Sequence, residues 1–325
     1  MRAVRLLGAV AMTIAAVGAC SSFGDASSTE PHEAETDAAV PDALVNPSDD
    51  ASGSEDGAPK VDSGVPCDRT APFTSIRPLE DVNTAAHEAF PRVSPDEHVI
   101  YFERFAGSDA SAIYRASRAT VGGAFGTPTK VEGLPDLPKQ PFVTADELEI
   151  FFLAPYQGRH AVWHARRNEV THPFGAAKLH PLGEPAFARF APFLSSDGVE
   201  LFFSQHVTDE NLLRTWVLPD GGLGGIDSLA GINSGARDSE PALSPDRLTL
   251  YFYSEREAEK DEGSIWVAHR ATPDEMFGTP TRVEELVFDG YFSSPGSVSV
   301  DNCRLYFYSN KDGSSYELYV AERFP

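Results

Sequence analysis

Five aspartates recur along the chain at nearly constant spacing, and repeated carboxylates could supply acid–base chemistry or bind calcium. They are separated by 50, 51, 49 and 55 residues: Asp96, Asp146, Asp197, Asp246 and Asp301. Each lies in an aligned phrase such as SPDEHVIYF or SSDGVELFF, often with Pro before it or Gly after it. In such turns an aspartate side chain accepts hydrogen bonds from the nearby backbone. Because the group recurs in every repeat, we assign these five residues a structural role in turns.

Other residues that could carry chemistry give weaker patterns. His160 and His164 are four residues apart, but RHAVWHARR reads as a strand, in which four residues span about 13 Å. They are therefore not expected to share a metal ion. The sequence contains no GxSxG, HExxH or Gly-rich phosphate loop. We expect no catalytic centre, no metal site and no cofactor.

These residues lie in repeats of about fifty residues, each with four extended segments. The first is short, as in PRVS or PFLS, and leads into the aspartate turn; the second is aromatic and β-branched, as in VIYFE or TLYFYS. The third reads AIYRASR, AVWHARR, SIWVAHR or ELYVAER, and the fourth is a closing phrase such as FGTPTKVEGL. The third repeat fits this template only loosely. Four strands per repeat predict an all-β fold, a β-propeller of five blades over residues 67–325, with six blades as the alternative.

One closing phrase stands at the wrong end of the chain. PFTSIRPLEDVN, at residues 72–83, precedes the first repeat, whereas the fifth repeat stops at its third segment, LYVAERFP. We predict that the N-terminal segment supplies the fourth strand of the last blade. Such pairing closes the ring and leaves no long unpaired edge.

The repeats resemble a known family. EPALSPDRLTLYFYSE followed by SIWVAHR, and RVSPDEHVIYFE followed by AIYRASR, resemble the WD40-like repeat of the periplasmic protein TolB and of many bacterial envelope lipoproteins. The resemblance covers roughly residues 84–325. It implies an extracytoplasmic propeller that serves as a docking surface for proteins or glycans. TolB has a separate N-terminal domain and six blades, which this sequence does not show, so TolB's own partners are not carried over.

Two cysteines of the propeller segment offer a test of the closure. Cys67 lies six residues before the orphan strand, and Cys303 lies at the start of the last blade's second strand. The second and fourth strands of a meander run in the same direction, so their starts share one end of the blade, about 9 to 10 Å apart. We predict a Cys67–Cys303 disulfide; the alternative is two unrelated buried thiols.

The N-terminal 66 residues differ in composition from the rest. Residues 1–19 hold two arginines, an apolar run and small residues, the layout of a secretory signal, and VGAC resembles a lipobox that ends at Cys20. We expect Cys20 to be lipidated and, because Ser21 follows it, the protein to be anchored at the outer membrane, facing the periplasm or the exterior. The rest, to residue 66, has eleven acidic residues against one lysine and reads as a disordered tether.

The charge restricts the possible partners. The formal net charge is −23, of which −15 lies in residues 67–325. Nucleic acid needs a basic surface and is excluded as a partner. We expect a monomer that contacts the membrane only through its lipid and binds an envelope protein or a glycan of unknown identity.

A carbohydrate-active enzyme is the alternative, because five-bladed glycoside hydrolases need carboxylates that converge on the central channel. The first strands, taken as PRVS, PFVT, PFLS, PALS and GSVS, contain no acidic residue. Glu88, Asp238 and Glu240 stand just before two of them and could reach the channel mouth.

A binding surface is expected on the face that carries the loops between second and third strands and between blades. Arginine and aromatic residues, which are enriched at interface hot spots, gather in these loops. The candidates are Arg104, Tyr156, Arg159, Phe187, Arg189, Arg237, Tyr291 and Phe292.

Overall fold

The computed structural model describes residues 67–107, 110–183, 188–206, 210–257, 262–313 and 315–324. The expected signal, the lipidation site Cys20, the acidic tether and the candidate residue Phe187 lie outside these ranges. The described helices are two single turns, η1 (Pro181–Gly183) and η2 (Glu284–Leu286). No described helix has the length and apolar character needed to cross a membrane.

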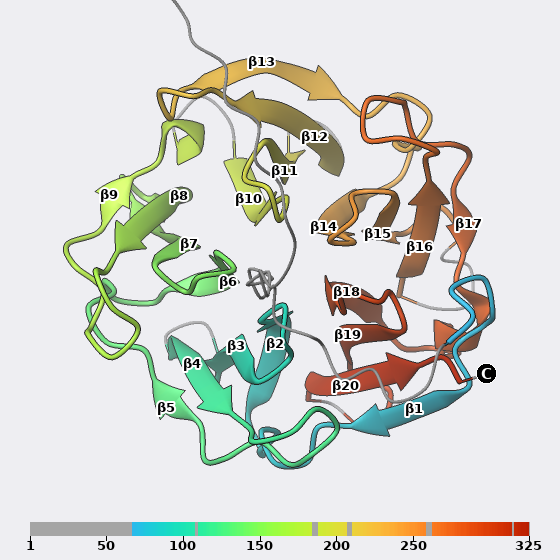
Figure 1. The fold of residues 1–325 in the computed structure, drawn as a ribbon, viewed down its shortest axis with the longest axis horizontal. Helices are drawn as coiled ribbons and strands as arrows, with labels where there is room; N and C mark the ends of the chain where they lie inside the picture. Colours follow the sequence, from blue (N-terminus) through green and yellow to red (C-terminus); the bar gives the residue numbers. More distant parts are fainter. Residues whose placement is uncertain are drawn as a thin grey trace, which may run out of the picture. The chain divides into compact units, whose positions relative to one another are not determined.

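Five four-stranded antiparallel sheets surround a central axis, which makes the fold a five-bladed β-propeller (Figure 1). The innermost strands are β2 (His87–Val93), β6 (Lys139–Val143), β10 (Ala188–Leu194), β14 (Asp238–Leu243) and β18 (Ser293–Val298). The second strands are β3 (Val99–Phe105), β7 (Glu149–Tyr156), β11 (Glu200–His206), β15 (Thr249–Ser254) and β19 (Arg304–Ser309). The third strands are β4 (Ser111–Ser117), β8 (Arg159–Arg166), β12 (Glu210–Val217), β16 (Ser264–His269) and β20 (Glu317–Glu322). The outermost strands are β5 (Thr129–Lys130), β9 (Lys178–Leu179), β13 (Leu223–Ser228), β17 (Thr281–Arg282) and β1 (Ser75–Pro78).

The ring closes as the sequence predicts. β1 pairs with β20 in the order β1-β20-β19-β18, with Ile76 opposite Ala321, and the two strands lie side by side in Figure 1. The disulfide between Cys67 and Cys303 is present, with the Cα atoms 6.0 Å apart. The N-terminal strand therefore completes the last blade, and a covalent bond holds it there.

The turns between first and second strands lie together at one end of the ring, which we call the turn face; the opposite end is the loop face. In each turn, one aspartate oxygen accepts a hydrogen bond from the hydroxyl two residues earlier and from the backbone N–H two residues later. Asp96, for example, accepts from the Ser94 hydroxyl at 2.5 Å and from the His98 N–H at 3.1 Å. The same pair of bonds forms at Asp146, Asp197, Asp246 and Asp301.

A repeated arginine joins neighbouring blades at the turn face. It is the last residue of the third-segment phrases, namely Arg118, Arg167, Arg270 and Arg323. Each donates through Nε to a backbone carbonyl, and each guanidinium lies 3.9 to 4.5 Å from the ring centre of a phenylalanine in the closing phrase. For Arg323 that ring is Phe73 of the orphan phrase, so the N-terminal segment uses the same contact as the other closing phrases.

The arginine also bonds to the second strand of the preceding blade. Arg118 donates to the Tyr306 hydroxyl at 2.8 Å, Arg167 to that of Tyr101 at 2.8 Å and Arg323 to that of Tyr251 at 3.0 Å. Arg270 meets Glu200 instead, at 2.6 Å. The equivalent residue of the third blade is Val217. Its backbone N–H donates to the Val199 carbonyl, as the N–H of each arginine donates to the equivalent carbonyl in its own blade, but its side chain cannot make the arginine contact. We call the arginine contact the blade bracket; four blade interfaces have it.

Every innermost strand contains a β-bulge at the same position. Four of the bulges have a non-glycine residue at positive φ directly before a proline, at Phe90, Gln140, Ala191 and Glu240. In the fifth blade the pair is Pro295–Gly296, and a Cβ on Gly296 would lie 2.4 Å from the Pro91 carbonyl oxygen of the first blade. The bulges re-aim the residues that follow them, and those residues line the channel.

Candidate functional site

The channel is lined by one residue from each innermost strand, two positions before the hydroxyl of the aspartate turn. These residues are Arg92, Phe142, Phe193, Ala242 and Ser297. Three large side chains therefore face two small ones. The ring centres of Phe142 and Phe193 are 5.0 Å apart, and the Arg92 guanidinium carbon lies 5.0 Å from the Phe193 ring centre.

Arg92 is hydrogen-bonded to both neighbouring blades. Its Nε donates to the Pro141 carbonyl of the second blade at 3.1 Å, and its Nη1 donates to the Gly296 carbonyl of the fifth. The residue is only 5% exposed. Burial lowers the pKa of Arg92 to about 10, while nearby Glu240 and Tyr308 act to raise it, so the side chain stays charged at neutral pH.

Toward the loop face, buried acidic groups lie between neighbouring blades. Glu240 accepts hydrogen bonds from the Tyr308 hydroxyl at 2.6 Å and from the Ser294 hydroxyl. Burial raises the pKa of Glu240, against the opposing effect of Arg237. Glu103, on β3, accepts from the Ser111 hydroxyl at 2.9 Å and from the Gln140 N–H at 2.9 Å.

The buried carboxyl of Glu103 makes stability depend on pH. Burial raises its pKa from 4.5 to about 7, so between those values the folded protein holds a proton that the unfolded chain releases. The contribution of the Glu103 carboxyl group to the free energy of unfolding is therefore fully present below pH 4.5 and is lost as the pH rises through 7. Between pH 4 and pH 8 the wild type is expected to lose about 3 kcal/mol of stability through this group, whereas Glu103→Gln, which has no carboxyl group at this position, does not show this loss. Urea unfolding of both proteins at pH 4 and pH 8 measures this. If the difference in unfolding free energy between the two proteins were the same at both pH values, the raised pKa of Glu103 would be contradicted.

Two further carboxylates, Glu88 and Asp238, occupy equivalent places in blades one and four. Glu88 accepts from the Thr84 hydroxyl and from Arg104 Nε, at 2.6 and 2.7 Å. Asp238 accepts from the Ser234 hydroxyl at 2.7 Å and from Arg256 Nη2 at 2.6 Å.

The matching environments come from a sequence motif that the repeat analysis missed. LEDVNTAAHE (79–88) and LAGINSGARD (229–238) align without gaps, including the asparagines Asn83 and Asn233. Each asparagine makes a pair of hydrogen bonds with the backbone of the preceding blade's third strand, at Leu318 and Leu212. The alignment could have found this motif, since the orphan phrase and the loosely fitting third repeat share it.

The first strands are longer than the tetrapeptides taken from the sequence, and β2 and β14 include Glu88, Asp238 and Glu240. The expectation that these strands lack acidic residues was therefore wrong. The bulge interrupts the pleat, so the earlier residues did not read as part of the same strand. Within the described part of the chain, however, the three carboxylates have separate hydrogen-bonding partners, and no group of three acidic, His or Cys side chains is placed to hold a metal ion.

The structure brings some of the predicted loop-face residues together. Arg237 lies 5.0 Å from the ring centre of Tyr253, whose ring is 5.0 Å from that of Phe292. Phe292 also packs against Tyr308 and Tyr316, at 5.2 and 5.5 Å. Tyr291, beside it in the chain, is 40% exposed. We call Arg237, Tyr253, Tyr291, Phe292 and Tyr316 the aromatic rim.

The other predicted residues make contacts within their own blades. Arg104 stacks on Tyr114 at 4.5 Å and binds Glu88, and Arg189 donates to the Gln205 side chain at 2.9 Å. Tyr156 and Arg159 are paired across the β7–β8 hairpin, and the Tyr156 ring meets Trp163.

Comparison with known proteins supports the fold. No family model matches the chain, and no curated protein matches it. Among solved structures, the putative TolB from Agrobacterium tumefaciens is 16% identical, with a TM-score of 0.50 over 76% of this chain and 83% of that one. A GH43 β-xylosidase/α-arabinofuranosidase from a compost microbial metagenome is 11% identical, with a TM-score of 0.50 over 77% and 94%. At these identities the similarity concerns the propeller fold alone.

Proposed function

We propose that this protein is an envelope lipoprotein whose propeller binds a protein or glycan partner through its loop face. In this proposal lipid on Cys20 provides the anchor at the outer membrane, residues 21–66 provide the reach, and the propeller acts as a monomeric scaffold.

The observation that carries the proposal is the aromatic rim. It combines the exposed Tyr291 with the partly exposed Arg237, Phe292 and Tyr316 at the junction of blades four and five, above the buried Tyr253. Tyrosine and arginine give large contact areas and are enriched where binding energy concentrates. The engagement of Glu88, Asp238 and Glu240 by partners within the fold favours a scaffold over a hydrolase, because a hydrolase needs carboxyl groups free to act on substrate.

A photo-crosslinking amino acid at position 291 tests the proposal in the native envelope. We expect it to capture a partner after irradiation, whereas the same amino acid at Ile226, which is 42% exposed on the outermost strand β13, should not. Gel shift and mass spectrometry identify the adducts. Equal labelling from both positions, or none from position 291, would count against the loop face as the binding surface.

A further inference from the structure

The turn face has a cavity at the end of the channel, to which all five blades contribute. Its volume is about 150 Å³. The wall is mostly aliphatic, with one residue from each innermost strand: Val93, Val143, Leu194, Leu243 and Val298. The mouth is formed by residues of the turns, among them Pro95, Ala145, Ser196 and Pro245.

The space follows from the unequal residues of the channel layer. Arg92, Phe142 and Phe193 fill one side, whereas Ala242 and Ser297 occupy the equivalent positions opposite. Five bulky residues would have closed the channel, as side chains do in small barrels. Of these five residues Arg92, Phe142, Phe193 and Ser297 line the cavity, and the small Ser297 leaves room that a bulkier side chain would fill.

Arg92 lies at the inner end of this cavity and keeps binding capacity there. A guanidinium has five N–H groups, and its Nε and Nη1 each donate to one carbonyl. Within the described residues, Nη2 has no hydrogen-bonding partner, and no carboxylate oxygen lies within 4.0 Å of the guanidinium nitrogens. A buried cation without a directly paired anion is unfavourable, so an anion that enters the cavity gains a charge-assisted bond to an arginine that is already desolvated, which offsets part of the anion's own desolvation cost.

We propose that this cavity binds a carboxylate carried on a small apolar body, with the carboxylate on Arg92 and the apolar part against the aliphatic wall. An arginine edge matches the two oxygens of a carboxylate. A single cation and an aliphatic wall suit a monoanion. Phosphate and other dianions are disfavoured because the wall hydroxyls of Thr144 and Ser195 already bond to the turn aspartates, whose charge lies at the same face.

Two sources can supply this chemistry, a free short-chain acid and the C-terminal residue of a polypeptide. The cavity opens on the face opposite the aromatic rim, so the two sites can be tested independently.

Calorimetry with the full chain distinguishes the outcomes. The probes are isobutyrate, its neutral analogue isobutyramide, and the peptide acetyl-Gly-Gly-Val. We expect at least one carboxylate to bind, and the amide to bind about ten- to one-hundredfold more weakly than isobutyrate because it lacks the charge. Binding of isobutyrate alone identifies a free acid as the ligand, and binding of the peptide alone identifies a chain terminus. Either result supports the site.

Two variants locate the binding. Arg92→Met should reduce the affinity for the carboxylate by about ten- to one-hundredfold. Ala145→Trp should block entry to the cavity while leaving Arg92 in place. Ala145 is exposed at the mouth, so the second variant keeps the test valid even if the first fails to fold. Equal affinity for isobutyrate and isobutyramide, binding unaffected by Ala145→Trp, or no binding of either carboxylate would overturn the proposal.

Discussion

Replacing both Cys67 and Cys303 with serine is expected to lower the free energy of unfolding by about 5 kcal/mol. The disulfide joins residues 236 positions apart, so nearly the whole propeller lies within the loop that it closes. Without the bond, the unfolded chain regains the entropy of that loop, and β1 is held to β20 by backbone hydrogen bonds, packing and the Arg77–Glu322 ion pair. Chemical denaturation, followed by tryptophan fluorescence, measures the difference.

Wild-type protein with its disulfide reduced is the matched control. It keeps both sulfur atoms and loses only the crosslink, whereas the serine variant also changes the packing of Cys303, which is buried. If the reduced protein and the variant lose similar stability, the effect belongs to the crosslink. A loss below about 1 kcal/mol in both would show that the unfolded chain is already restrained in another way.

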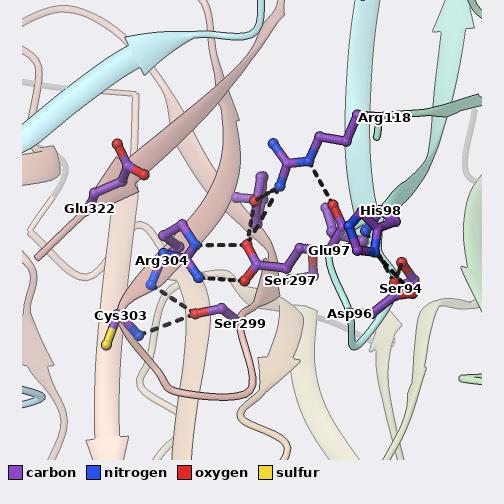
Figure 2. A network of polar contacts seen from close by, with 12 residues as sticks. Ser94, Asp96, Glu97, His98, Arg118, Ser297, Ser299, Cys303, Arg304 and Glu322 are labelled. Atoms are coloured by element: carbon purple, nitrogen blue, oxygen red, sulfur yellow. Dashed lines mark hydrogen bonds and ion pairs between the residues drawn. The ribbon is translucent and has the colours of Figure 1, made fainter. Parts of the chain in front are cut away.

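Glu97→Ala is expected to destabilise the protein by about 3 to 5 kcal/mol. Glu97 is buried between blades five and one, where its two oxygens accept hydrogen bonds from Arg304 at 2.6 and 2.7 Å (Figure 2). One of these oxygens also accepts from the Tyr306 hydroxyl at 2.5 Å. Arg118 approaches at 3.7 Å. Removing the carboxylate leaves Arg118 buried and the Arg304 guanidinium, which is mostly buried, without its bidentate partner.

Glu169→Gln provides the control for loss of a carboxylate as such. Glu169 is exposed and lies 3.7 Å from His172 in a surface pair, so its substitution should change stability by about 0.5 kcal/mol or less. Thermal and urea denaturation of the two variants beside the wild type gives the comparison. Similar losses for Glu97→Ala and Glu169→Gln would mean that the buried network contributes nothing beyond a surface charge.

Repetition made the architecture predictable from sequence. The phrases around the five turn aspartates give the number of blades, and the orphan phrase together with Cys67 and Cys303 gives the closure. These features are short sequence phrases that align without gaps from repeat to repeat, so each repeat independently predicts the same four-stranded blade. The terminal arginine of the third-segment phrases was visible in the same alignment, but its role depends on the neighbouring blade, which the alignment alone does not place.

The channel was harder to predict, because its chemistry lies in departures from the repeat. Arg92 is the R of PRVS, at a position where the other blades have Phe, Phe, Ala and Ser. The repeat pattern predicts that the position faces the axis, but not that small residues opposite leave a cavity. The extent of β2 and β14 was missed for a similar reason: a bulge next to proline hides the start of the strand. Glu88 and Asp238 thus read as loop residues, although both are buried.

The missing blade bracket between the second and third blades makes the ring unequal around its circumference. Val217 replaces the arginine there, and the facing residue of the second blade is Phe151, which has no hydroxyl to accept a bond. The strand at the chain ends is fastened by a covalent bond, whereas the junction of blades two and three lacks the bracket; its contacts include the Phe142–Phe193 ring pair and a hydrogen bond from the Ala191 N–H to the Gln140 side-chain oxygen at 2.8 Å. Local opening of the ring is therefore expected first at this junction, away from the chain termini, and would expose the facing sides of the second and third sheets.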